Sequence, residues 1–258
     1  MKIVLFDLET LPNLKEVMKI YCGIGAYPGL TLKATITSII CFGYKIHGRK
    51  HAKVISTWDF PKRWKKDVND DYDVCKAAYD ILHDADVVVG HHINGFDWKH
   101  LQTRLMVNGL PTLPTSIIKI DTKQISSKNL FAFNNRLGTL GEAFVKDKKL
   151  ENNGWITWVG VSERKEKDQK LMARYCKQDV NLLEKLFIKF RPLIKTLPNP
   201  NLDKKGSNLH CPNCSSQMMT KQGIRIAKTA KFQQYQCQDC GSWAREKVPA
   251  EKTTLKSA

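Results

Sequence analysis

The stretch that most constrains this chain is Phe6-Asp7-Leu8-Glu9-Thr10, which follows the run Lys2-Ile3-Val4-Leu5. The apolar, β-branched content of that run predicts a buried strand. Side chains alternate between the two faces of a strand, so Asp7 and Glu9 share one face while Leu8 points into the core. Neighbouring carboxylates repel each other unless they share cations, and oxygen ligands of this kind suit Mg²⁺ or Mn²⁺. The stretch predicts a metal-binding strand end, provided that carboxylates from elsewhere join it.

The overall charge points to a polyanionic partner. The 258 residues include 42 Lys and Arg against 25 Asp and Glu, which gives a formal net charge of +17. Such an excess favours nucleic acid, because each phosphate that is neutralised releases counterions.

No apolar run approaches the roughly 18 residues of a membrane span, and no secretory signal is recognisable. We therefore expect no membrane partner and a cytoplasmic location, in a bacterium or a phage-infected cell.

The hydrophobic pattern predicts a mixed α/β domain. Beyond the first strand it predicts strands at 36–44, 53–58, 85–90 and 117–120, and helices at 73–82, 97–108, 137–145 and 170–193. Pro and Gly between 11 and 32 exclude one long regular element there. Residues 152–160 predict a loop, in which Trp155 and Trp158 either stack on bases or pack on the core.

Further acids fall at suitable places in this pattern. Asp97 lies at the start of a predicted helix, after His91 and Phe96. In the last long helix, Tyr175 and Asp179 are four residues apart and share a face. Packed against the sheet, that face would bring an acid and a phenol to the end of the first strand.

This ordered set resembles the DEDDy group of DnaQ-like 3′-5′ exonucleases, and the resemblance spans about residues 1 to 195. It implies an RNase H-like mixed sheet flanked by helices over residues 1–198. It also implies two Mg²⁺ or Mn²⁺ ions, and it identifies Tyr175 as the residue that orients the attacking water. The metal ligands that it implies are Asp7, Glu9, Asp97 and Asp179.

The resemblance extends to residues that contact the substrate. Thr10 and Leu11 fall where such enzymes line the pocket for the terminal nucleotide, and we expect His91, His92 and Asn94 near the substrate as well. One departure concerns the family's His-Asn-Gly, which aligns with His91, His92 and Ile93. Asn94 and Gly95 come two residues later in this chain.

The residue types suit phosphodiester hydrolysis in their own right. The reaction needs a hydroxide close to phosphorus and relief of charge on the leaving 3′ oxygen, and two metal ions about 3.5 to 4 Å apart supply both. Tyr175, with an ordinary pKa near 10, is a poor base and is expected to place the water by hydrogen bonding.

We expect single-stranded DNA as substrate. The alternatives are RNA trimming or decay, a structure-selective endonuclease, and a nucleic-acid-binding or inhibitor protein without activity.

The C-terminal part predicts a zinc ribbon. After a linker at 199–206, Cys211 and Cys214 form one Cys-x-x-Cys pair and Cys237 and Cys240 another, a spacing typical of one structural Zn²⁺. We expect the ribbon at 207–248, with strands at 223–227 and 232–236, and a disordered tail at 249–258. Residues 203–258 carry ten Lys and Arg against four Asp and Glu. With Phe232, Tyr235 and Trp243 interleaved, the ribbon is expected to bind nucleic acid, or alternatively to dock a protein partner.

Overall fold

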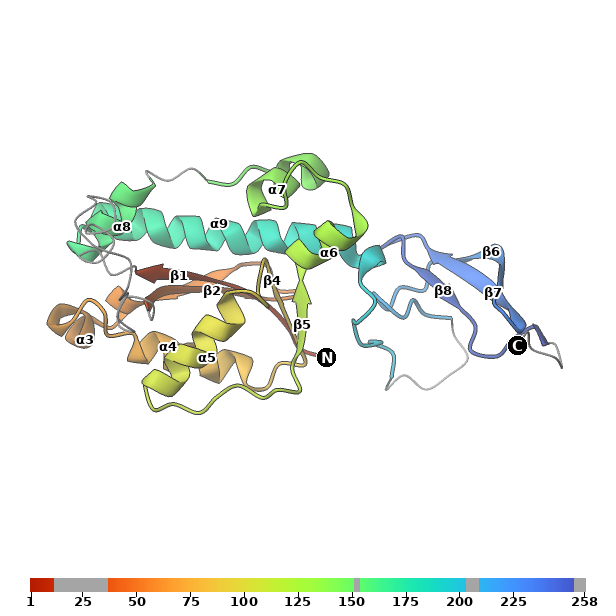
Figure 1. The fold of residues 1–258 in the computed structure, drawn as a ribbon, viewed down its shortest axis with the longest axis horizontal. Coiled ribbons are helices and arrows are strands. Elements are labelled where there is room, and N and C mark those ends of the chain that lie inside the picture. Colours follow the sequence, from red (N-terminus) through yellow and green to blue (C-terminus); the bar gives the residue numbers. More distant parts are fainter. Residues whose placement is uncertain (12–36, 151–153, 203–208, 253–258) are drawn as a thin grey trace, which may run out of the picture. The chain divides into compact units, whose positions relative to one another are not determined.

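The structure, a computed structural model, describes residues 1–11, 37–150, 154–202 and 209–252 (Figure 1). The predicted irregular segment at 11–32 therefore lies outside the described residues, apart from Leu11. The chain divides into two compact units, Met1–Leu186 and Phe187–Ala258.

A five-stranded mixed sheet forms the centre of the first unit. Its order is β3-β2-β1-β4-β5, in which β1 pairs antiparallel with β2 and parallel with β4. The strands are β1 (Ile3–Leu11), β2 (Ser38–Ile46), β3 (Lys53–Ser56), β4 (Val87–Gly90) and β5 (Ile118–Asp121). The predicted fold class, a mixed α/β sheet flanked by helices, is confirmed.

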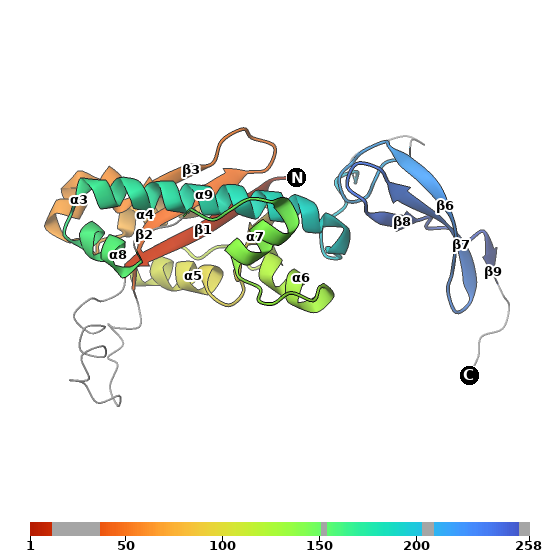
Figure 2. The same cartoon turned by 90° about the horizontal axis from the view of Figure 1, so that it is seen from above.

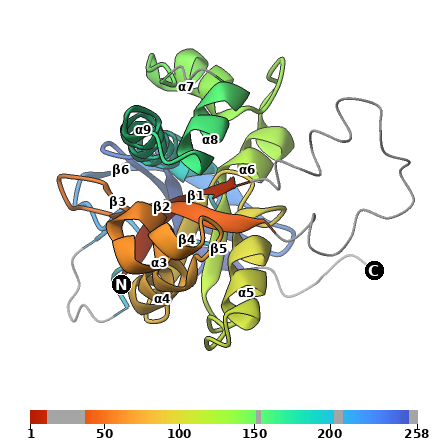
Figure 3. The same ribbon diagram turned by 90° about the vertical axis from the view of Figure 1, so that its left-hand side faces the viewer.

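Helices cover both faces of this sheet. In Figure 3, α7, α8 and α9 lie on one side and α4 and α5 on the other, and Figure 2 shows α9 running along β1. The helices are η1 (Thr57–Asp59), α3 (Pro61–Lys66), α4 (Tyr72–Leu82), α5 (Asp97–Val107), α6 (Thr122–Asn129), α7 (Leu137–Val145), α8 (Trp155–Ser162) and α9 (Glu166–Phe190).

One local prediction is wrong. The segment predicted as a loop at 152–160 is in large part α8, which begins directly after Gly154. Gly154 has a φ of 54°, a left-handed conformation that turns the chain into the helix. Val161 of this helix packs in a buried cluster with Met172 and Cys176 of α9. Tertiary packing thus stabilises a helix that the Gly and Trp content did not predict.

The alternation of β1 separates its core side from its polar side. Val4, Phe6 and Leu8 pack with side chains of α4 and α5 in the main core. Leu11 packs in the other buried cluster, on the side of α9. Asp7 and Glu9 are on that same side, so the face of β1 toward α9 carries the acids, as the alternation predicted.

Gly43 allows α9 to approach the sheet closely. It lies opposite Asp7 in the pairing of β1 with β2. A Cβ atom at Gly43 would stand 2.6 Å from Cys176 Sγ and 3.0 Å from a methyl carbon of Val180. Since real Cβ contacts are longer than this, any larger residue would push away the part of α9 that carries Asp179.

The second unit contains η2 (Arg191–Leu193) and a small sheet. Its strands are β6 (Met219–Ile226), β7 (Ala230–Cys237), β8 (Trp243–Arg245) and β9 (Glu251–Lys252). The order is β6-β7-β8, and β9 pairs with β7. Both predicted ribbon strands are present and are longer than predicted, while β9 lies within the stretch expected to be disordered. Residues 253–258 of that stretch lie outside the described residues.

Candidate active site

Three carboxylates from β1 and α9 converge. Ligand atoms of Asp7, Glu9 and Asp179 all lie within 4.8 Å of one another. Glu9 and Asp179 are buried, with 8% and 2% of their surface exposed. We call these three residues, together with Asp97, the acid cluster.

Asp97 lies beside the other three acids but is not part of the group whose ligand atoms lie within 4.8 Å of one another. It is the first residue of α5 and is buried. Its Oδ1 accepts the backbone N–H of Leu8 at 3.3 Å, which places its carboxylate directly beside β1. The structure therefore brings all four predicted acids to the same end of β1, with three of them in mutual contact distance.

Burial and mutual repulsion raise the pKa values of these acids. Burial, with the charges of Asp97, Glu9 and Asp179, raises the pKa of Asp7 well above its ordinary range. Burial and the charge of Asp179 raise the pKa of Glu9 to about 8. Burial also raises the pKa of Asp97 to about 7 and that of Asp179 to about 6. Such a cluster favours the binding of cations, which relieve the repulsion.

Lys149 supplies a positive charge to the cluster, and sequence reasoning missed it. It lies in the segment after α7, where its Nζ is 2.7 Å from Asp179 Oδ2 and 4.5 Å from the centre of the Tyr175 ring. The charge of Asp179 raises the pKa of Lys149 in spite of burial, which lowers it. No pattern in the sequence marks this role, because Lys149 stands in a polar run among other lysines.

Tyr175 is fixed by aromatic contacts. Its ring meets that of Trp158 edge-on, with ring centres 6.4 Å apart, and the Trp158 indole N–H donates to the carbonyl of Thr10 at 3.1 Å. Burial and the charge of Asp179 raise the pKa of Tyr175 to about 12, so the phenol stays protonated. Of the two readings for Trp158, packing on the core is the one observed. The side chain of Trp155 lies outside the described part of the chain.

His91, His92 and Asn94, which were predicted to lie near the substrate, form hydrogen bonds with β5, with the start of α6 and with the loop before α7. Both ring nitrogens of His91 have neighbours, since Nε2–H donates to the carbonyl of Asn135 at 2.9 Å and Nδ1 lies 3.0 Å from Thr122 Oγ1. Burial lowers the pKa of His91 to about 4, so its ring is neutral. The backbone N–H groups of His92 and Asn94 donate to the Asp121 carboxylate, at 3.0 and 3.2 Å.

Asp121 organises this segment in addition to capping a helix. Its side chain accepts the N–H groups of Lys123 and Gln124 at the start of α6, which makes it the N-cap of that helix. Thr10 and Leu11, the other predicted substrate contacts, differ in exposure. Thr10 is half-buried, whereas Leu11 is 3% exposed and belongs to the core.

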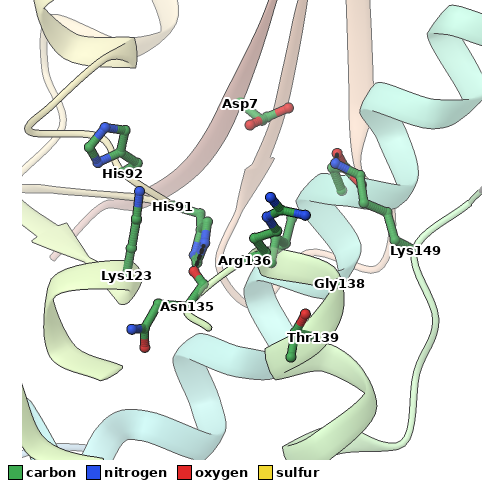
Figure 4. A pocket seen from close by; sticks show the side chains of 11 residues that line it. Asp7, His91, His92, Lys123, Asn135, Arg136, Gly138, Thr139 and Lys149 are labelled. Atoms are coloured by element: carbon green, nitrogen blue, oxygen red, sulfur yellow. Dashed lines mark hydrogen bonds and ion pairs between the residues drawn. The ribbon is translucent and has the colours of Figure 1, made fainter. Parts of the chain in front are cut away.

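A pocket of about 440 Å³ opens beside the acid cluster (Figure 4). Asp7 and Asp179 form its acidic part, and His91 and His92 also line it. Around them, Figure 4 shows three basic side chains from separate parts of the chain: Lys123, Arg136 and Lys149. An acidic centre with a basic surround suits a ligand that combines phosphate groups with bound cations.

The acid cluster fits divalent cations that prefer oxygen. Its ligand atoms are carboxylate oxygens, which Mg²⁺ and Mn²⁺ bind in preference to nitrogen or sulfur. Asp179 Oδ1 is buried and has no hydrogen-bond partner among the described residues. A buried carboxylate oxygen of this kind ordinarily has a partner, so a cation is the group that would complete it.

Four cysteines form a second cluster, in the second unit. The sulfur atoms of Cys211, Cys214, Cys237 and Cys240 lie within 4.8 Å of one another. Cys211 Sγ is 3.7 Å from Cys240 Sγ, and Cys214 Sγ is 3.6 Å from Cys237 Sγ. Zn–S bonds of about 2.3 Å in a tetrahedron place the sulfurs about 3.8 Å apart, so the set fits one Zn²⁺.

The two Cys-x-x-Cys segments fold alike. In each, the first cysteine donates its N–H to the residue five positions on and accepts from the residue four positions on. That fourth residue is Ser215 in one segment and Gly241 in the other, with φ of 69° and 73°. The repeated turn directs four sulfurs to one centre.

The three aromatic residues that were expected to bind nucleic acid in the ribbon differ in solvent exposure and in their contacts. Tyr235 is buried, and its hydroxyl lies 2.7 Å from Glu246 Oε1. The Arg245 guanidinium lies 3.7 Å from the centre of the Phe232 ring. Trp243 is 54% exposed.

Comparisons with known proteins establish the fold. No family model matches the chain, and no curated protein matches its sequence. Among solved structures, the fold matches the family B DNA polymerase from the hyperthermophilic archaeon Pyrobaculum calidifontis, with a TM-score of 0.54 and 18% identity. The match covers 74% of this chain and 25% of the polymerase chain, so the protein spans about a quarter of its length. Within the described residues, no helix is long and apolar enough to cross a membrane.

Proposed function

We propose that the chain is a DnaQ-like exonuclease of the DEDDy group, which hydrolyses nucleotides from the 3′ end of a nucleic acid with two divalent metal ions. The observation that carries this proposal is the convergence of Asp7, Glu9 and Asp179, with Asp97 beside them, around a buried and unpartnered carboxylate oxygen. The fold shared with part of a DNA polymerase agrees with an action on nucleic acid.

The acid cluster would hold the two ions, as Mg²⁺ or Mn²⁺. When bound, such ions stabilise negative charge on the attacking and leaving oxygens of a phosphodiester displacement. The carboxylates themselves offset most of the charge of the ions. Their raised pKa values favour this role, because bound cations relieve the repulsion between the buried carboxylates.

Tyr175 would position the water. With a pKa near 12 it remains a hydrogen-bond donor and acceptor throughout the neutral range, so it orients the nucleophile instead of deprotonating it. The water oxygen forms a bond to the terminal phosphodiester phosphorus, and the bond from phosphorus to the 3′ oxygen of the preceding nucleotide breaks. The attacking water loses a proton to solvent and the leaving 3′ oxygen takes one from solvent, so the products are a nucleoside 5′-monophosphate and a chain that ends in a 3′-hydroxyl.

The basic surround of the pocket would hold the substrate backbone. Lys123 and Arg136 line the pocket on the side of α6 and α7. Each phosphate contact of this kind contributes affinity that decreases with salt. We expect single-stranded DNA as the substrate, with RNA as the alternative.

The zinc ribbon would assist in binding substrate. Its basic residues favour phosphate contacts, and exposed Trp243 can stack on a base. Removal of residues 207–258 should weaken substrate binding and flatten its salt dependence. An unchanged salt slope would instead indicate that the ribbon docks a protein.

A time course on labelled oligonucleotides tests the proposed activity. The full chain is incubated with Mg²⁺ or Mn²⁺ and 5′-labelled single-stranded DNA or RNA of the same sequence. Asp7→Ala is the inactive variant, and Asp80→Asn is the matched control, because Asp80 is an exposed acid of α4. We expect a ladder that shortens from the 3′ end with wild type and Asp80→Asn, absent with Asp7→Ala.

Other outcomes of this experiment contradict the proposal. Internal fragments at early times would indicate an endonuclease. Binding of the oligonucleotides without cleavage under any divalent ion would indicate an inactive nucleic-acid-binding protein.

A further inference from the structure

The loop between α6 and α7 presents two phenylalanine rings to solvent. Phe131 and Phe133 are exposed to 105% and 98%, whereas Ala132 between them is half-buried. Both rings therefore stand on the outer side of the loop. Two fully exposed aromatic rings so close in the chain form an apolar patch of the kind that marks an interaction site.

Hydrogen bonds hold this loop at both ends. At its start, the N–H of Leu130 donates to the carbonyl of Ser126 in α6. Toward its end, Asn135 accepts from the His91 ring, and the N–H of Arg136 donates to Asn134 Oδ1 at 3.0 Å. Asn135 is thereby tied to His91, directly after β4, so the end of the loop is anchored beside the pocket.

The loop leads directly into the pocket. Asn135 and Arg136, at its end, line the pocket beside Asp7 and Asp179. Phe133 is two residues from Asn135 and Phe131 four, so they lie within about 7 and 14 Å of it along the chain. At ~3.4 Å per stacked nucleotide, this reach covers about four nucleotides of a strand that ends in the pocket.

The charge of the loop and its flanks complements a polyanion. Between Asp121 and Glu142 the sequence contains Lys123, Lys128 and Arg136 and no acidic residue. Aromatic faces next to basic side chains are the combination that binds single-stranded nucleic acid, because bases stack on the rings while phosphates meet the cations.

We propose that Phe131 and Phe133 stack on unpaired bases upstream of the scissile phosphate and so select a single-stranded end. This inference rests on the proposed exonuclease function and specifies the form of its substrate. In a duplex, both faces of each base are already stacked, so the rings have no surface to bind. A paired 3′ end should accordingly bind and react more weakly than an unpaired one.

Binding measurements in the Asp7→Ala background test this inference without cleavage. The probe is a single-stranded oligonucleotide with 2-aminopurine at the second to fourth position from its 3′ end, whose fluorescence decreases when it stacks. Phe131→Leu/Phe133→Leu keeps apolar side chains but removes the aromatic faces. Phe131→Tyr/Phe133→Tyr keeps the aromatic faces. Met106→Ala/Val107→Ala, at the exposed end of α5, is the control for loss of exposed apolar surface.

We expect the leucine variant to bind the single strand roughly 5- to 150-fold more weakly for each stack that is lost. The salt slope should stay unchanged, because no phosphate contact is removed. The 2-aminopurine quenching should disappear as well. The tyrosine variant and the α5 control should match the parent, and all variants should bind a blunt duplex equally.

Several results would overturn the inference. One is equal binding and quenching by the leucine variant and its parent while wild type still degrades the strand. Another is that the leucine variant loses association with lipid vesicles or with a second copy of the chain and keeps its affinity for the strand. Absence of strand binding and cleavage by wild type would instead reject the proposed function itself.

Discussion

The two candidate metal centres differ in what holds their ligands in place. The acid cluster lies on a five-stranded sheet with buried clusters on both faces, so its ligands are positioned by the fold. In the described residues 209–252, by contrast, the buried side chains are those of Cys211, Tyr235, Cys237 and Ser242. The fold therefore preforms the acid cluster, whereas a metal bound by the four cysteines would have to contribute to the folding of the second unit.

The largest expected effect is therefore on the ribbon. Removal of Zn²⁺ by a chelator, or Cys214→Ser, should unfold residues 209–252, since structural zinc contributes an apparent 10–16 kcal/mol to small domains. Hydrogen exchange should show rapid exchange there and unchanged protection in β1 and β4. Equal loss of protection in both units would break the distinction between the centres.

A large effect on activity is expected at the acid cluster. Asp179→Asn should lower turnover by ~10³-fold or more, because metal ions contribute several kcal/mol to transition-state stabilisation. The fold should persist, since the sheet does not depend on the ions. Glu166→Gln, on the exposed first turn of the same helix, is the control. Turnover that persists in Asp179→Asn would remove this residue from the proposed mechanism.

A smaller effect is expected for the residue that positions water. Tyr175→Phe removes one hydrogen bond of ~1.4 kcal/mol, which corresponds to about a tenfold lower kcat with little change in KM. The pH profile of the variant between pH 6 and 9 should keep the shape of the wild-type profile, because a phenol with a pKa near 12 does not titrate there. Loss of a titration step in the variant would instead identify Tyr175 as a base.

The smallest effect concerns the stability of the metal-free protein. Between about pH 4.5 and 8 the unfolded chain releases the proton of Glu9 while the folded chain retains it, so stability falls as pH rises through this window. Glu9→Gln cannot ionise, so in chelator at pH 8.5 its Tm should exceed that of wild type by ~2–4 °C, equivalent to ~1 kcal/mol.

The comparison of Glu9→Gln with wild type should reverse when Mg²⁺ is added, because the wild-type carboxylate then gains a cation. Glu142→Gln, an exposed acid of α7, should show neither change. A Glu9→Gln variant that melts below wild type in chelator at every pH would show that the cluster is not strained by its own charge.

Much of this arrangement followed from periodicity and spacing. The alternation of β1 predicted that Asp7 and Glu9 face away from the main core, and the Cys-x-x-Cys spacing predicted the four-sulfur cluster; the structure confirms both. Such signals are local, so they survive without knowledge of tertiary contacts. Lys149 and Gly43 carried no such signal, because their roles arise from contacts with α9 that only the folded chain creates.

The histidines show a second limit. A sequence pattern identified His91 as a residue near the substrate, and it does line the pocket. Its ring nitrogens, however, lie against Thr122 and Asn135, over thirty residues away in the sequence. Long-range hydrogen bonds of this kind leave no mark on the local pattern.

The C-terminal part of β1 has backbone groups that β4 does not pair. β1 pairs with β4 from Ile3 to Leu5, and beyond this the backbone of Leu8 and Thr10 bonds to the side chains of Asp97 and Trp158. An open edge on an apolar strand is a template for strand addition and aggregation. Asp97 of α5 and Trp158 of α8 hydrogen-bond to these backbone groups. The groups are therefore not available for pairing with a strand of another molecule.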